Sequence, residues 1–158
     1  APALLELGVP LLVSHMFVFY FGILADLTPP VALACFAAAP IAGERGLEIS
    51  LWAVRIAIAG FVVPFMAVYA PALMLQDSGG LAIAYSVGKA TLAIGLWGMA
   101  SIGHLRASLT WWERLLAFGA GAALILALPI TDEVGFALAL LAIGLHLWRT
   151  RPVEIPAT

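Results

Sequence analysis

The chain has 158 residues, of which 64% are hydrophobic and 10% are charged, and its net charge is −2. A soluble domain averages about 45–50% apolar and about 25% charged residues, so this composition predicts an integral membrane protein. Seven scattered basic residues exclude a nucleic-acid surface, and one cysteine excludes an internal disulfide and a multi-cysteine metal site. The chain begins with Ala1 and shows no basic leader, so we expect it to belong to a longer polypeptide.

Apolar blocks separated by charged or Gly/Pro-rich clusters predict the helices, because one bilayer crossing needs about 20 apolar residues. No block alternates polar and apolar residues with a period of two, which argues against a barrel of strands. The sequence therefore predicts an all-α fold, a polytopic transmembrane helical bundle. The predicted helices cover residues 8–25, 31–42, 51–75, 81–103, 111–128 and 134–148.

The first apolar block stops at DLTPP, residues 26–30, before apolar sequence resumes. Proline removes a backbone donor and clashes with the preceding helical turn, so Pro29 and Pro30 must break any helix here. The block that follows is too short to cross a bilayer alone. Residues 8–42 therefore form either one long interrupted helix or a re-entrant hairpin, and both alternatives stay open.

The block at residues 51–75 contains Pro64 and Pro71. We interpret these prolines as kinks in one helix, because neighbouring helices can satisfy the freed carbonyl groups. The alternative is a second interrupted helix that faces the first.

Basic residues predict the orientation of the helices, because short cytoplasmic loops accumulate Lys and Arg. The connections QDSGG and PITDE contain neither residue, whereas the connections GERGLEIS and HLRASLTWWER and the tail contain arginine. This alternation places the C-terminus in the cytoplasm. An aromatic belt at the same ends of the helices agrees with this orientation. The residues concerned are Arg45, Arg55, Arg106, Arg114, Arg149 and Arg151 for the charge and Trp111, Trp112 and Trp148 for the belt.

Irregular polar backbone inside a bilayer survives only where it lines a cavity or is buried in protein, so residues 26–30 are a candidate ion or substrate site. Asp26 is an ionisable group at expected membrane depth; the alternative is that it is solvated at a helix end. Thr28 adds a hydroxyl oxygen, and we expect Pro29 and Pro30 to keep the preceding carbonyls out of the helical ladder. Such oxygens are sodium ligands in discontinuous transporter helices. Gly22 allows close approach of backbone or substrate.

Other charged residues are expected to be less informative. Lys89, the only lysine, either extends outward along its helix or pairs with a carboxylate such as Asp26, and we favour the first. We interpret Asp132 and Glu133 as ordinary loop charges. No nucleotide-binding loop, HExxH or paired-histidine motif occurs, so an enzyme is not expected.

The segments SHMFVFYFGILADLTPPVALACFAAAPIAG and FVVPFMAVYAPALML closely resemble the large membrane subunit of tripartite ATP-independent periplasmic (TRAP) transporters. Within that family, the likeness is to fused permeases that work with a TAXI-type binding protein. It is strong from about Ser14 to Leu75 and weak from there to the C-terminus. The C-terminal portion of such a permease is therefore the expected identity of the chain.

The resemblance implies sodium-coupled import of an organic acid or related solute across the bacterial inner membrane. Sodium is the implied coupling ion, with no cofactor, and the implied partners are a periplasmic solute-binding protein, the remainder of the permease and membrane lipid. Thr28, Pro29 and Pro30 inherit a place near substrate and sodium, with Gly22 and Asp26 as flanking candidates. Residues 1–75 would belong to the transport region and residues 76–158 to a C-terminal three-helix membrane region. The alternative is a non-transporting helical membrane subunit in which the TPP sequence makes only a packing kink.

Overall fold

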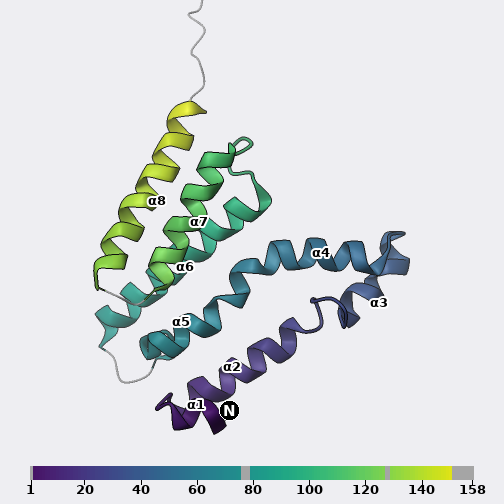
Figure 1. Ribbon diagram of the computed structural model, residues 1–158, viewed down its shortest axis with the longest axis horizontal. Coiled ribbons are helices and arrows are strands. Elements are labelled where there is room, and N and C mark those ends of the chain that lie inside the picture. The colour runs from purple at the N-terminus through teal and green to yellow at the C-terminus, as the bar shows by residue number, and fades with distance from the viewer. Residues whose placement is uncertain (1, 76–78, 127–128, 151–158) are drawn as a thin grey trace, which may run out of the picture.

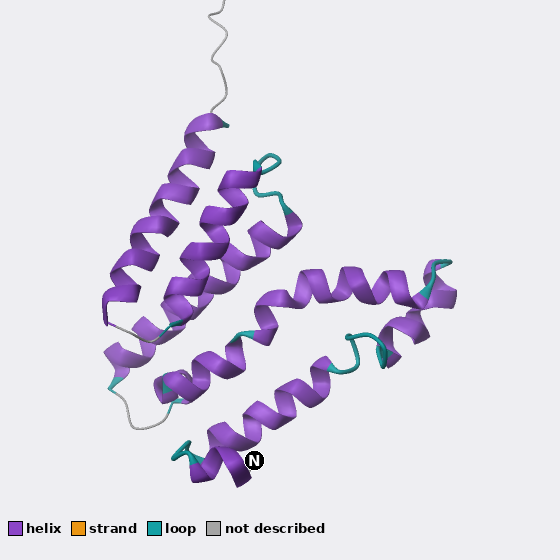
Figure 2. Ribbon diagram, in the orientation of Figure 1, coloured by secondary structure: helices purple, strands orange, loops and turns teal. Residues whose placement is uncertain are grey.

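The computed structural model describes residues 2–75, 79–126 and 129–150, and no β-strand occurs in these ranges (Figures 1 and 2). The predicted all-α fold is confirmed. Some predicted features lie outside the described residues. They are part of the connection at 76–80, the end of the block at 111–128, and Arg151. The elements in chain order are α1 (Pro2–Glu6), α2 (Leu11–Leu24), α3 (Leu33–Ala42), α4 (Gly46–Ala57), η1 (Ile58–Phe61), α5 (Val63–Tyr69), η2 (Pro71–Met74), α6 (Gly80–Ile102), α7 (Trp111–Ile125) and α8 (Pro129–Arg149).

Helices α2 and α3 are separated by a non-helical segment at residues 25–32, which we call the first break. The break predicted at residues 26–30 is present. Figure 1 shows α3 leading away from α2 rather than folding back beside it. Packing agrees, because α2 contacts α5 whereas α3 contacts α4. Of the two alternatives, this arrangement corresponds to the long interrupted helix.

The single kinked helix predicted for residues 51–75 is wrong. Helix α4 begins earlier, at Gly46, and ends at Ala57; a 3₁₀ turn and Val62 then separate it from α5. We call residues 58–62 the second break. Pro64 occupies the first turn of α5, where a missing N–H costs nothing, so it starts a helix instead of kinking one. The alternative, a second interrupted helix, is what the structure contains.

The two interrupted helices run side by side and are joined by a cluster of phenylalanine rings (Figure 1). Phe17 and Phe21 of α2 meet Phe65 of α5 with ring centroids 5.2 and 5.7 Å apart, both in edge-to-face geometry. Phe21 also lies 6.4 Å from Phe61 in the second break. Aromatic pairs at these separations stabilise a contact beyond simple area burial. The rings therefore hold the end of α2 against the second break.

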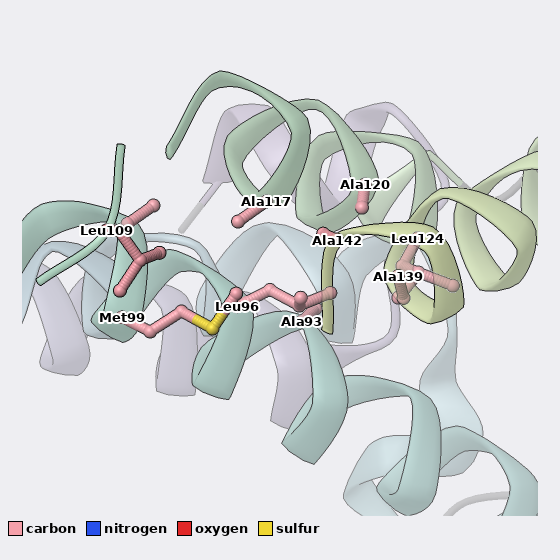
Figure 3. Packing of buried hydrophobic residues seen from close by; sticks show 10 residues of the cluster. Ala93, Leu96, Met99, Leu109, Ala117, Ala120, Leu124, Ala139 and Ala142 are labelled. Carbon is pink, nitrogen blue, oxygen red and sulfur yellow. The ribbon is translucent and has the colours of Figure 1, made fainter. Parts of the chain in front are cut away.

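Helices α6, α7 and α8 form a three-helix unit, in which α7 packs against both of the others (Figure 1). Small side chains let the helices approach closely, which favours association where packing is the main driving force. Figure 3 shows their buried side chains meeting between the three helices. The buried cluster consists of Ala93, Leu96, Met99, Ala100, Leu109, Ala117, Ala120, Leu124, Ala139 and Ala142.

One end of this unit is fixed by the first turn of α7. Thr110 and Glu113 form a capping box, in which each side chain bonds the backbone N–H of the other. Arg149, at the end of α8, donates to the same carboxylate at 2.8 Å and to the carbonyl of Ser108 at 2.7 Å. His146 is fully buried, with its Nδ1 3.4 Å from Glu113. The end of α8 is thereby tied to the start of α7.

Helix α8 begins at Pro129, five residues before the predicted start at Val134. Asp132 is therefore a residue of the first helical turn, where the helix dipole favours a negative charge. The prediction that Asp132 is an ordinary loop charge is wrong.

Among the described residues, two helices are long and apolar enough to cross a bilayer, at Gly80–Ile102 and Ile130–Arg149. Only 22% of the most apolar window of each is buried within the chain. A core helix of a soluble protein would bury most of that surface, whereas lipid covers it in a membrane bundle. Helices α2 and α3 are apolar but shorter. Length, composition and exposure together are consistent with a helical membrane bundle.

Candidate functional site at the first break

The first break is a compact turn whose backbone is largely satisfied by its own hydrogen bonds. The N–H of Ala32 donates to the carbonyls of Thr28 and Ala25, at 2.9 and 3.3 Å, and the N–H of Ala34 donates to the carbonyl of Asp26 at 3.2 Å. Ala32 is fully buried and adopts a left-handed conformation with φ of 38°. A side chain other than glycine rarely adopts this conformation, which stores local strain.

The hydroxyl group of Thr28 turns back onto the end of α2. Thr28 Oγ1 donates to the carbonyl of Leu24 at 3.1 Å and also lies 3.4 Å from that of Ala25. Its proton is therefore used within the chain. The lone pairs of the hydroxyl oxygen stay available for a cation or another donor.

Carbonyl oxygens are left over at a different place from the predicted one. We expected the carbonyls of the residues before the prolines to be kept out of the helical ladder and so left free. Those of Asp26 and Thr28 instead accept from the N–H groups of Ala34 and Ala32, so they are not left over for a ligand. In the first break, the carbonyls of Pro29, Pro30 and Val31 accept no hydrogen bond from the described residues. Proline has no N–H, and the left-handed Ala32 turns the chain before α3 begins, so the next helical ladder does not reach these oxygens.

Asp26 and Gly22 both lie on exposed surface. Among the described residues no side chain bonds or pairs with the Asp26 carboxylate, and no atom approaches within 4 Å of a Cβ placed on Gly22. Grooves over the described residues lie along α4, between α5, α6 and α7, and along α6 beside α8, and residues of the first break line none of these. Thr28, Pro29 and Pro30 are thus brought together with Asp26 in one turn, and Gly22 lies one turn earlier on α2.

Lys89 does not pair with Asp26 and does not extend outward. Its side chain is 8% exposed, and its Nζ lies 3.0 and 3.1 Å from the two carboxylate oxygens of Asp132. Tyr85 donates to the same carboxylate at 2.7 Å. The preferred prediction for Lys89 is wrong, and so is the partner named in the alternative. The pair joins α6 to α8, far from the first break in sequence.

Two features of the first break were missed by sequence reasoning. The left-handed Ala32 gives no signal, because Gly or Asn is the usual residue in that conformation. Cys35 is buried and its Sγ lies 3.8 Å from the carbonyl of Leu27, which fastens the start of α3 to the turn. The described residues hold no group of three or more His, Cys, Asp or Glu side chains suited to a transition metal. The groups in this turn that could bind a cation are therefore oxygen atoms of the backbone and of Thr28.

The family model for the tripartite ATP-independent periplasmic transporter, DctM component, matches residues 1–80. This match covers α1 to η2 and ends where α6 begins. The chain belongs to this family, which confirms the resemblance to the TRAP large membrane subunit and makes it an integral membrane component of a transporter rather than of an enzyme family. No curated protein and no solved structure matches the chain.

Proposed function

We propose that this chain is part of a permease that imports an organic acid or related solute together with sodium. Membership of the DctM family and the interrupted helix at the first break support the proposal. A periplasmic solute-binding protein would deliver the solute, as a tripartite system requires, and the TAXI-type fused permeases are the subgroup we favour. The membrane would be the bacterial inner membrane, with the connections rich in arginine and the C-terminus in the cytoplasm.

The first break supplies oxygen atoms of the kind that sodium prefers. The hydroxyl oxygen of Thr28 retains lone pairs, and the carbonyls of Pro29, Pro30 and Val31 accept no hydrogen bond from the described residues. Asp26 adds an exposed carboxylate in the same turn. Hard cations bind such oxygens, and transporters present them where a helix is interrupted. We propose that this turn forms half of a sodium and substrate site, with Gly22 on its flank and the other half supplied by the remainder of the permease.

The driving force would be the sodium gradient together with the membrane potential. Each elementary charge that crosses a potential of 100 mV changes in free energy by about 2.3 kcal/mol. Co-transport of sodium with an anionic solute draws on this potential whenever more sodium charges than solute charges move inward.

A substitution of Thr28 tests the proposed ion site directly. Thr28→Val keeps the shape of the side chain but removes the oxygen, so we expect the sodium concentration for half-maximal uptake to rise about tenfold. Thr28→Ser retains the hydroxyl and is the matched control, with sodium dependence close to that of the wild type. The measurement is solute uptake against sodium concentration by the full-length permease in proteoliposomes with its binding protein. Unchanged sodium dependence in Thr28→Val would remove this residue from the ion site.

One observation favours the alternative, in which the first break is a packing kink of a subunit that does not itself bind solute. The Thr28 hydroxyl already bonds the end of α2, and most carbonyls of the turn are satisfied internally. If packing is the only role, Thr28→Val lowers the thermal stability of the permease and leaves the sodium dependence of the remaining uptake unchanged. The same pair of variants therefore separates the two functions.

A further inference from the structure

The three-helix unit meets the family-matched part of the chain mainly through α6, which packs against α4, η1 and η2. Ser101, near the end of α6, is buried, and its hydroxyl donates to the carbonyl of Arg55 at 2.6 Å. Arg55 lies in the last turn of α4, just before the second break. Carbonyls in the last turn of a helix lack intrahelical donors, so Ser101 supplies a donor where the interrupted helix needs one.

Ser101 is itself held in place by α7. The guanidinium group of Arg114 donates to the carbonyls of Ala100 and Ser101, at 2.7 and 3.2 Å, and so caps the end of α6. Gly103 ends the helix in a left-handed conformation with φ of 78°, and a Cβ there would lie 3.2 Å from the same guanidinium. A continuous chain of hydrogen bonds thus runs from α7 through the end of α6 to the last turn of α4.

Apolar contacts support the second break from the other side of the same interface. Val62 and Met66 line a narrow apolar space together with Ala93 and Trp97 of α6, and this space is too small for a water molecule. An interrupted helix inside a bilayer is tolerated where neighbouring helices and their hydroxyl side chains satisfy the freed backbone groups. The Ser101 hydroxyl provides the polar contact that supports the second break, and the side chains of α6 provide the apolar contacts.

We propose that Ser101 is a positioning residue through which the three-helix unit holds the second break in its interrupted conformation. The unit would then act as a support for the transport region, although it lies beyond the family match. This inference does not depend on sodium coupling, because it concerns the conformation of α4 and the second break. Its failure would leave the proposed ion site at the first break untouched.

The test is amide hydrogen exchange of the full permease in lipid nanodiscs, followed on peptides that cover residues 53–62. Ser101→Thr and Ser101→Val have nearly the same shape and differ in the hydroxyl group. We expect wild-type exchange in the Thr variant and about threefold faster exchange in the Val variant, which is the factor for losing one average interhelical hydrogen bond in a membrane protein. Peptides from α8 should be unaffected in both.

Thr91→Val is the matched control on the same helix. Thr91 is exposed, and among the described residues its hydroxyl bonds only the carbonyl of Val87, one turn earlier. It should leave exchange at residues 53–62 unchanged. If Ser101→Val does not fold, Ser101→Cys takes its place, since a thiol is only a weak donor. Equal exchange at residues 53–62 in the hydroxyl-bearing and hydroxyl-free variants overturns the proposal.

Discussion

At the scale of single residues, the pair of Lys89 and Asp132 shows how the structure accommodates charge inside a membrane bundle. An unpaired charge in the bilayer is costly, and this pair is largely shielded from solvent, with side chains 8% and 19% exposed. The ammonium group of Lys89 lies within hydrogen-bond distance of both carboxylate oxygens of Asp132, and Tyr85 donates to one of them. The ammonium group also lies 5.8 Å from the Tyr85 ring centroid. The cluster joins α6 to α8, and each of its three side chains makes a hydrogen bond to another.

Removal of one charge of this pair should be more harmful than removal of both. Lys89→Met leaves the Asp132 carboxylate enclosed without its counter-charge, so we expect a loss of about 3 kcal/mol in the free energy of unfolding. Lys89→Met with Asp132→Leu should return to within about 1 kcal/mol of the wild type, since two apolar side chains can replace a buried pair. Unfolding by denaturing detergent measures both values. Additive losses in the double variant would show that the two residues are not coupled.

The residues of the first break were largely predictable, whereas the pair of Lys89 and Asp132 was not. Two consecutive prolines exclude a helix by local sterics alone, so residues 26–30 identify the turn without any knowledge of the fold. The partner of Lys89 lies 43 residues away and depends on how three helices pack. Pro129 and Asp132 do carry the usual signals of a helix start, Pro in the first turn and a nearby acid, which would have moved Asp132 into α8.

At the scale of elements, α6 and α7 approach each other closely at Gly121. A Cβ on this residue would overlap the indole ring of Trp97. That ring stacks on Phe118 with centroids 4.4 Å apart, and its Nε1 donates to the Phe118 carbonyl at 3.0 Å. Gly119, two residues earlier, is exposed, and a Cβ placed on it would meet no atom within 4 Å. The two glycines therefore offer a matched comparison on one helix.

Gly121→Ala should lower the free energy of unfolding by about 1–3 kcal/mol, because the indole must move and lose its hydrogen bond. Gly119→Ala should be neutral or stabilising by up to about 1 kcal/mol, since alanine is the better helix former. Thermal unfolding of the purified permease in detergent compares the two. A Gly121→Ala variant as stable as Gly119→Ala would contradict the close packing of α6 on α7.

The predicted helix boundaries agree with the structure where a long apolar run stands between glycines. They differ from it where charged residues lie inside a helix. The block predicted at residues 81–103 agrees with α6 within one residue at each end. Helix α4 was placed too late, because Glu48 was assigned to a loop, although an acid in the first turn stabilises a helix start. The second break was given only as the alternative to a kinked helix, because Pro64 suits the first turn of α5 as well as it suits a kink.

At the scale of the whole molecule, two interrupted helices lie side by side and the three-helix unit packs against the second of them (Figure 1). The family match covers the interrupted pair and ends at the start of α6. We propose that residues 1–75 form part of the transport region and that the C-terminal helices support this region. Composition alone predicts a membrane protein, because a chain with 64% hydrophobic residues has too few polar residues to cover a soluble surface. The pairing of the interrupted helices depends on contacts between distant segments, which no local pattern encodes.

In the proposed function, sodium drives the permease that contains this chain. The most direct measurement is uptake of radiolabelled organic acids, presented on the binding protein, into proteoliposomes that hold the complete permease. We expect accumulation only with an inward sodium gradient, and faster accumulation when the interior is negative. Equal uptake after potassium or choline replaces sodium would contradict the claim.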